Sequence, residues 1–184
     1  EQDLRHLVLH DRPEAHGLGE VLWDVAGLQS LARSRHNVAV ETRAASRLLE
    51  RWGMALQPLR QRAGRQAEGS VWLESTWTPA LNEARVTGDR LLWAGALPHT
   101  DLASPAGLLV AHSPRGSLMW LAVPRVASEA AYIDFLARLL RARPGVWRVF
   151  LHGPDLSRAP AVTTWLAGQP RLKLQPCPVA PAAR

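Results

Sequence analysis

The chain has 184 residues and 47% apolar content, so it can bury a core but can hold at most two small folding units. Its apolar runs, such as Leu118 to Val123, break within about eight residues, well short of the roughly 20 that span a bilayer. We therefore expect a soluble, cytoplasmic protein with no membrane partner. A single cysteine, Cys177, can form no internal disulfide and supplies no zinc cluster.

The formal net charge is +6, and all but one of the 22 basic residues are arginines, the exception being Lys173. A guanidinium group is a planar fork that matches phosphate and guanine. Between Arg33 and Arg65, eight arginines stand against two glutamates, which gives this stretch a net charge of +6. The pattern favours nucleic acid as the partner, although a GC-rich genome would also enrich arginine codons.

Apolar residues recur at spacings of three and four along residues 19–26 and 27–35, which predicts two short helices. A third helix is predicted to begin at Glu41 or Thr42 and to end at Gly53. Its buried face would consist of Ala45, Leu48, Leu49 and Trp52. Two helices joined by a short turn, the second with an arginine-rich outer face, are typical of a helix-turn-helix DNA-binding domain. An ordinary three-helix bundle with a basic surface fits the same pattern.

The outer face of this third helix is expected to enter the major groove of duplex DNA. The basic stretch after it has too few apolar residues to pack, so its arginines are expected to follow phosphates. The expected DNA-binding residues are Arg43, Ser46, Arg47, Arg51, Arg60, Arg62 and Arg65.

From residue 70 onward the pattern changes to short strands. The predicted strands span residues 70–77, 108–113, 117–123 and 147–151, with a further strand beginning at Leu172. Gly116 marks a hairpin between the second and third strands. Helices are predicted over residues 128–141, with Ser128 as the cap, and over 160–167. The order strand, strand, strand, helix, strand, helix, strand predicts a mixed sheet with helices on its faces.

The N-terminal third contains a series of short motifs: Arg12-Pro13, Gly17, Leu22-Trp23-Asp24, Leu28, Leu31, Val38-Ala39-Val40 and Leu48 to Gly53. This series resembles the second helix-turn-helix of the mariner-type transposases of bacterial insertion sequences, and the later strand order is similar to the RNase H-like catalytic domain of that family. The resemblance implies a mixed α/β chain of three parts. These are a three-helix helix-turn-helix domain over 1–56, a basic linker over 57–69, and an RNase H-like domain over 70–184 that lacks the last catalytic helix.

The family cuts and joins DNA with three carboxylates that hold two Mg²⁺ ions. Alignment to the family pattern puts Leu73 at the first aspartate position and His152 at the second, and the chain stops before the third. Glu74 is displaced by one residue, which on a strand would turn it to the opposite face. Asp155 lies three residues beyond the fourth strand, where a turn or cap is the common role. We therefore expect no catalytic residues, no metal and no cofactor.

The sequence thus predicts a transposase-derived protein that binds double-stranded DNA, at the nucleoid, without cutting it, and the resemblance allows a homodimer. The alternative is a protein-interaction or assembly module built on the degenerate RNase H-like domain, and a third is a decayed remnant. Exposed tryptophans would favour the interaction module. Six of the eight tryptophans are expected to be buried: Trp23, Trp52, Trp77, Trp120, Trp147 and Trp165. Trp72 and Trp93 could lie on the surface.

Overall fold

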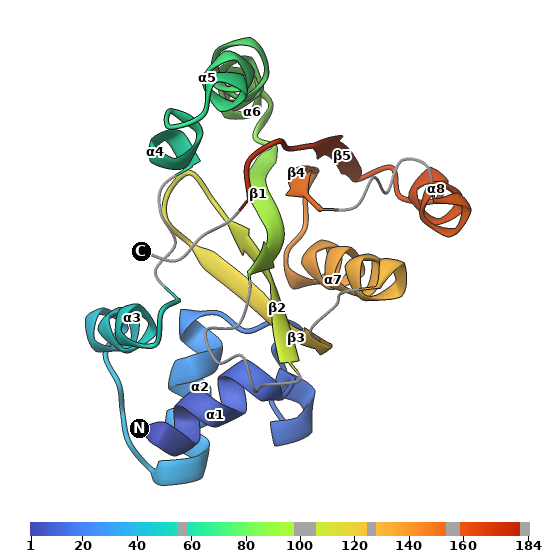
Figure 1. Ribbon diagram of the computed structural model, residues 1–184. Helices are drawn as coiled ribbons and strands as arrows, with labels where there is room; N and C mark the ends of the chain where they lie inside the picture. Colours follow the sequence, from blue (N-terminus) through green and yellow to red (C-terminus); the bar gives the residue numbers. More distant parts are fainter. Residues whose placement is uncertain (55–58, 98–105, 125–127, 154–158, 181–184) are drawn as a thin grey trace.

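A computed structural model describes residues 1–54, 59–97, 106–124, 128–153 and 159–180 (Figure 1). This part of the chain is a mixed α/β fold built on a five-stranded sheet. The strands are β1 (Arg90–Leu97), β2 (Ala106–His112), β3 (Leu118–Pro124), β4 (Trp147–His152) and β5 (Leu172–Pro176). Their spatial order is β3-β2-β1-β4-β5. β2 is antiparallel to both of its neighbours, whereas β1, β4 and β5 run parallel to one another. The expected mixed sheet is confirmed.

The predicted hairpin joins β2 to β3. The Ser113 N–H donates to the Ser117 carbonyl over 2.9 Å, and Gly116 has a φ of 90°. Only glycine adopts such a φ without a steric cost, so Gly116 permits the tight reversal. The predicted strands over 108–113, 117–123, 147–151 and from Leu172 are confirmed as β2 to β5.

The predicted strand over residues 70–77 is wrong. This stretch is helical: α5 (Ala67–Trp72) leads through a π-helical turn, η2 (Leu73–Trp77), into α6 (Thr78–Thr87). The buried residues Trp77, Ala80 and Ala84 recur at spacings of three and four, which suits a helix and not a strand. The first strand is instead β1, an apolar run that is buried on both faces and so shows no alternation.

The N-terminal third also differs from the prediction. The helix expected over 19–26 is wrong, because only its last two residues are helical. Trp23 instead forms an antiparallel bridge with Trp120 of β3, with reciprocal backbone hydrogen bonds of 2.9 Å. An unpredicted helix, α1 (Gln2–His10), and a short 3₁₀ turn, η1 (Pro13–His16), precede that bridge.

The other two helices match their predictions. α2 (Val25–His36) confirms the helix expected over 27–35, and Asp24 caps it by accepting from the Gly27 N–H over 2.8 Å. α3 (Thr42–Arg51) confirms the third helix, with Glu41 at its N-cap and Gly53 just beyond its end at a φ of 76°.

The stretch expected to be an unpacked linker contains α4 (Leu59–Ala63). Leu59 and Ala63 are both buried, so the expectation that this stretch cannot pack is wrong. Gly69 of α5 lies so close to α4 that a Cβ atom would stand 2.5 Å from the Ala63 carbonyl oxygen. Glycine is therefore what lets the two helices touch.

The strands alternate their side chains between two helical layers. Leu109 and Ala111 of β2 face α7 (Glu129–Ala142) and α8 (Pro160–Ala167), in one buried cluster. Leu108 and Val110 point the other way, into a cluster shared with α1, α2 and α3. The helices α4 to α6 cover the rest of that second face, over β1 and β4. One core thus joins residues of the expected N-terminal part to the sheet.

Most of the tryptophans lie in these clusters. Five of the six expected to be buried are so, whereas Trp165 is only half-buried. Trp93 is also buried, and its indole N–H donates to the Val179 carbonyl over 2.8 Å. Trp72 is half-buried and stacks edge-on against Phe150, with 5.3 Å between ring centroids.

Candidate nucleic-acid interface

α2 and α3 are held together by a short, well-anchored turn. Asn37 ends α2 in the left-handed region, with a φ of 54°, and its N–H donates to the Arg33 carbonyl. The Gln29 amide donates to the Val40 carbonyl over 2.6 Å and so fixes the turn against α2. Below the turn, Ala45 and Leu49 anchor the inner face of α3 in the core. Leu48, expected to be buried as well, is half-buried.

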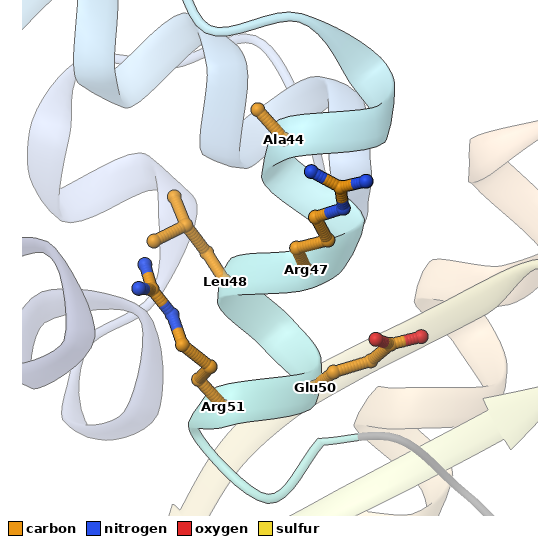
Figure 2. A pocket seen from close by; sticks show the side chains of 5 residues that line it. All are labelled: Ala44, Arg47, Leu48, Glu50 and Arg51. Atoms are coloured by element: carbon orange, nitrogen blue, oxygen red, sulfur yellow. The ribbon is translucent and has the colours of Figure 1, made fainter.

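The outer face of α3 carries two arginines without acidic partners. Arg43 and Arg47 are exposed, and neither forms an ion pair within the part of the chain that the structure describes. They are four residues apart, so they lie one above the other on the helix surface. Figure 2 shows Arg47 standing clear of the helix, with Glu50 on the side away from Leu48 and Arg51. A hollow open to solvent is lined here by Ala44, Arg47, Leu48, Glu50 and Arg51, and Arg43 lies outside it.

The other two expected DNA-binding residues of α3, Arg51 and Ser46, already form contacts within the protein. The Arg51 guanidinium lies 3.0 Å from the Glu1 carboxylate, which also accepts from the Trp52 indole over 3.2 Å. The Ser46 hydroxyl donates to the Thr42 carbonyl one turn earlier, over 3.0 Å. Arg43 and Arg47 are therefore the side chains of α3 that are most available to a ligand.

The predicted phosphate-binding arginines around α4 are not equivalent. Arg60 and Arg65 are exposed. Arg62 is half-buried, and its Nε atom is enclosed without a hydrogen-bond partner in the described residues. Arg60 and Arg65 can reach a phosphate from the surface, whereas Arg62 would have to turn outward first.

Leu73 and His152, the two residues that align with aspartates of the transposase pattern, do not lie side by side on the sheet. Leu73 belongs to the helical turn η2, so it does not stand on a strand beside His152. The residue paired with His152 across the sheet is Gly95 of β1. Glu74 is exposed on the same helical turn, so the strand argument against it does not apply. Asp155, the other acid considered, lies outside the described residues.

His152 closes β4 with its ring Nδ1 3.0 Å from the Cys177 carbonyl oxygen. The Cys177 thiol is buried, and burial raises its pKa to about 11, so it is protonated at neutral pH and is a poor metal ligand in that form. No three His, Cys, Asp or Glu side chains in the described ranges lie close enough to hold a metal ion.

Two arginines that sequence analysis did not identify form ion pairs that join separate elements of the fold. Arg138 of α7 is buried and donates to Glu14 over 2.5 Å, to Asp134 over 2.9 Å and to the Val21 carbonyl over 2.8 Å. Its hydrogen bond holds the pKa of the Glu14 carboxyl below the usual range. No local pattern reveals this contact, because Glu14 and Arg138 are 124 residues apart in the chain.

The second structural arginine is Arg148 of β4. It pairs with Glu83 of α6 and lies 2.6 Å from Asp89, just before β1. Its hydrogen bond holds the pKa of the Asp89 carboxyl below the ordinary value. Arg138 and Arg148 are therefore neutralised by carboxylates and are not available for DNA, in contrast to Arg43 and Arg47.

No protein-family model, curated protein or solved structure matches this chain. Among the described helices, none is both long and apolar enough to cross a membrane.

Proposed function

We propose that this chain is a transposase-derived DNA-binding protein that contacts duplex DNA through α3 and does not cut it. The observation that carries the proposal is the uncompensated pair Arg43 and Arg47, exposed on a helix whose opposite face is packed in the core. A helix fits the major groove, where an arginine fork can bind guanine in a bidentate manner. Arg60 and Arg65 add contacts to phosphates.

The order of elements supports a relation to RNase H-like domains. Three strands, a helix, a strand, a helix and a strand follow one another along the chain, and the first and fourth strands are parallel neighbours. No residue from Arg90 to Leu97 is acidic, and a histidine ends β4. Two-metal DNA cleavage needs carboxylates to hold the ions. We propose that the sheet is kept as a scaffold, in a protein that acts at the nucleoid and can form a homodimer.

The alternative, an interaction or assembly module, finds less support. It called for exposed tryptophans, and six of the eight are buried. The large exposed hydrophobic residues in the described part are Val38 in the turn between α2 and α3, Val71 in α5 and Val86 in α6. A scattered set of this kind forms no contiguous apolar surface for a protein partner.

The test is a titration of a labelled DNA duplex and the matching single strand with purified protein at about 50 and 200 mM salt. Because phosphate contacts release counterions, the proposal predicts duplex binding that falls steeply as salt rises. Absence of duplex binding at the lower salt, from protein shown by circular dichroism to be folded, would refute the proposal.

A further inference from the structure

A second basic surface lies at the end of the sheet where β1, β4 and β5 begin. Arg90 opens β1, and its Nε donates to the Pro144 carbonyl over 3.0 Å, just before β4. The Trp147 N–H at the start of β4 donates to the Arg171 carbonyl over 2.7 Å, just before β5. These contacts place three segments that are distant in sequence side by side. Figure 1 shows the same neighbourhood of β1, β4 and β5.

Positive charge predominates at this sheet-end surface. Its basic side chains are Arg90, Arg141, Arg143, Arg148, Arg171 and Lys173, and its acidic side chains are Glu83 and Asp89, a net charge of +4. Both acids are paired with Arg148, and Asp89 also lies 3.5 Å from Lys173. Arg141, Arg143 and Arg171 are exposed and have no acidic partner among the described residues. Most of the positive charge is therefore uncompensated.

Two of these arginines are held in place without being neutralised. The Arg90 guanidinium carbon lies 5.5 Å from the centroid of the Trp147 ring, besides the bond to Pro144. Arg171 donates from Nη2 to the Leu140 carbonyl over 3.2 Å. A guanidinium has five N–H donors, and a carbonyl partner uses one of them without cancelling the charge. The remaining donors are preorganised for an anion, which lowers the entropy cost of binding.

We propose that the sheet-end surface binds backbone phosphates of duplex DNA as a contact separate from α3. The inference rests on the proposed DNA-binding function. Seven residue steps of β1 separate Arg90 from Leu97, which packs in the cluster beneath α1 to α3. At about 3.3 Å per residue, this distance is roughly 23 Å. The two surfaces therefore lie toward opposite ends of β1 and can be tested as separate contacts.

The experiment compares three double variants in binding a labelled duplex of about 30 base pairs between about 50 and 200 mM salt. The sheet-end variant is Arg141→Gln/Arg143→Gln, and both of its side chains are exposed. The α3 variant is Arg43→Gln/Arg47→Gln. The control variant, Arg5→Gln/Arg35→Gln, removes the same charge from exposed residues of α1 and α2 that are assigned to no interface.

The sheet-end variant should reduce the slope of log affinity against log salt by about two relative to the control, since each phosphate contact contributes about 0.9. Adding Arg171→Gln should remove about one more unit. The loss should be the same for any duplex sequence, because phosphates carry no sequence information.

The outcomes separate this inference from the proposed function. A sheet-end variant with the salt slope of the control would overturn the second surface and leave α3 as the interface, with Arg141 only offsetting the α7 dipole. If the sheet-end variant loses slope and the α3 variant does not, the second surface is supported and α3 is not the interface. If wild-type protein binds no duplex at the lower salt, both proposals fail.

Discussion

The bridge between Trp23 and Trp120 predicts that the N-terminal helices and the sheet unfold together. The Trp120 indole is fully buried, and its N–H donates to the Val8 carbonyl of α1 over 2.8 Å. The same residue pairs through its backbone with Trp23. Replacing Trp120 by Ala therefore removes packing on the sheet and the hydrogen bond to α1 in a single change.

The size of the effect follows from this burial. Truncating a buried tryptophan to alanine lowers the free energy of unfolding by about 3–5 kcal/mol. For Trp120→Ala we expect a loss in the upper half of this range, because the Val8 carbonyl also loses its hydrogen-bond donor. Trp120→Phe keeps an aromatic ring and loses the hydrogen bond, so it should cost about 1–3 kcal/mol. As a matched control, Trp165→Ala removes the same side chain from a half-exposed position on α8 and should cost about 1–2 kcal/mol.

The assay is urea unfolding followed by far-ultraviolet circular dichroism, which detects the helices and the sheet together. We expect one transition in the wild type, shifted as a whole to lower urea by Trp120→Ala. Two resolved transitions, with the one from the N-terminal helices unaffected by the change, would show that these helices fold as an independent domain and would refute the argument.

Three further predictions concern charge and catalysis. Arg138 lowers the pKa of the Glu14 carboxyl below 4.5, so this ion pair stabilises the fold above about pH 4.5 and loses that effect as the pH falls through the lowered pKa. The Glu14→Gln variant should therefore lose less melting temperature than the wild type between about pH 5 and 3. The same pH profile for variant and wild type would contradict the role of the pair. Arg47→Ala should cost about 1–3 kcal/mol of DNA-binding free energy and relax any sequence preference. Arg65→Ala should instead lower the affinity for every duplex alike and reduce the slope of log affinity against log salt by about one. Titrations of several duplex sequences with both variants test this difference. A supercoiled plasmid incubated with the protein and Mg²⁺ or Mn²⁺ should stay intact, and cleavage that Glu74→Ala abolishes would overturn the loss of catalysis.

Elements with strong local signals were predictable from sequence. The apolar spacing of α3 and α7 and the Ser128 cap, whose hydroxyl accepts from the Ala131 N–H over 3.2 Å, identify those helices. Gly116 identifies the hairpin, because only a left-handed residue closes it. Each of these features depends on residues a few positions apart, which a linear pattern records.

The failures have equally specific causes. The predicted strand over residues 70–77 failed because the buried residues Trp77, Ala80 and Ala84 follow a helical period that continues past the end of this segment. β1 was missed because it is buried on both faces and shows no alternation. The partners of Arg138 and the contacts that anchor Arg90 and Arg171 depend on tertiary structure. No local sequence pattern separates these arginines from the exposed Arg43 and Arg47.

The central claim is that exposed arginines of α3 bind duplex DNA. Its most direct test is the affinity of the Arg43→Gln/Arg47→Gln variant, against the control Arg5→Gln/Arg35→Gln, for one duplex at about 100 mM salt, with both variants confirmed as folded. We predict that the α3 variant binds at least about tenfold more weakly than the control, equivalent to about 1.4 kcal/mol. Equal affinities of the two variants would show that these arginines only solvate the helix, and would contradict the claim.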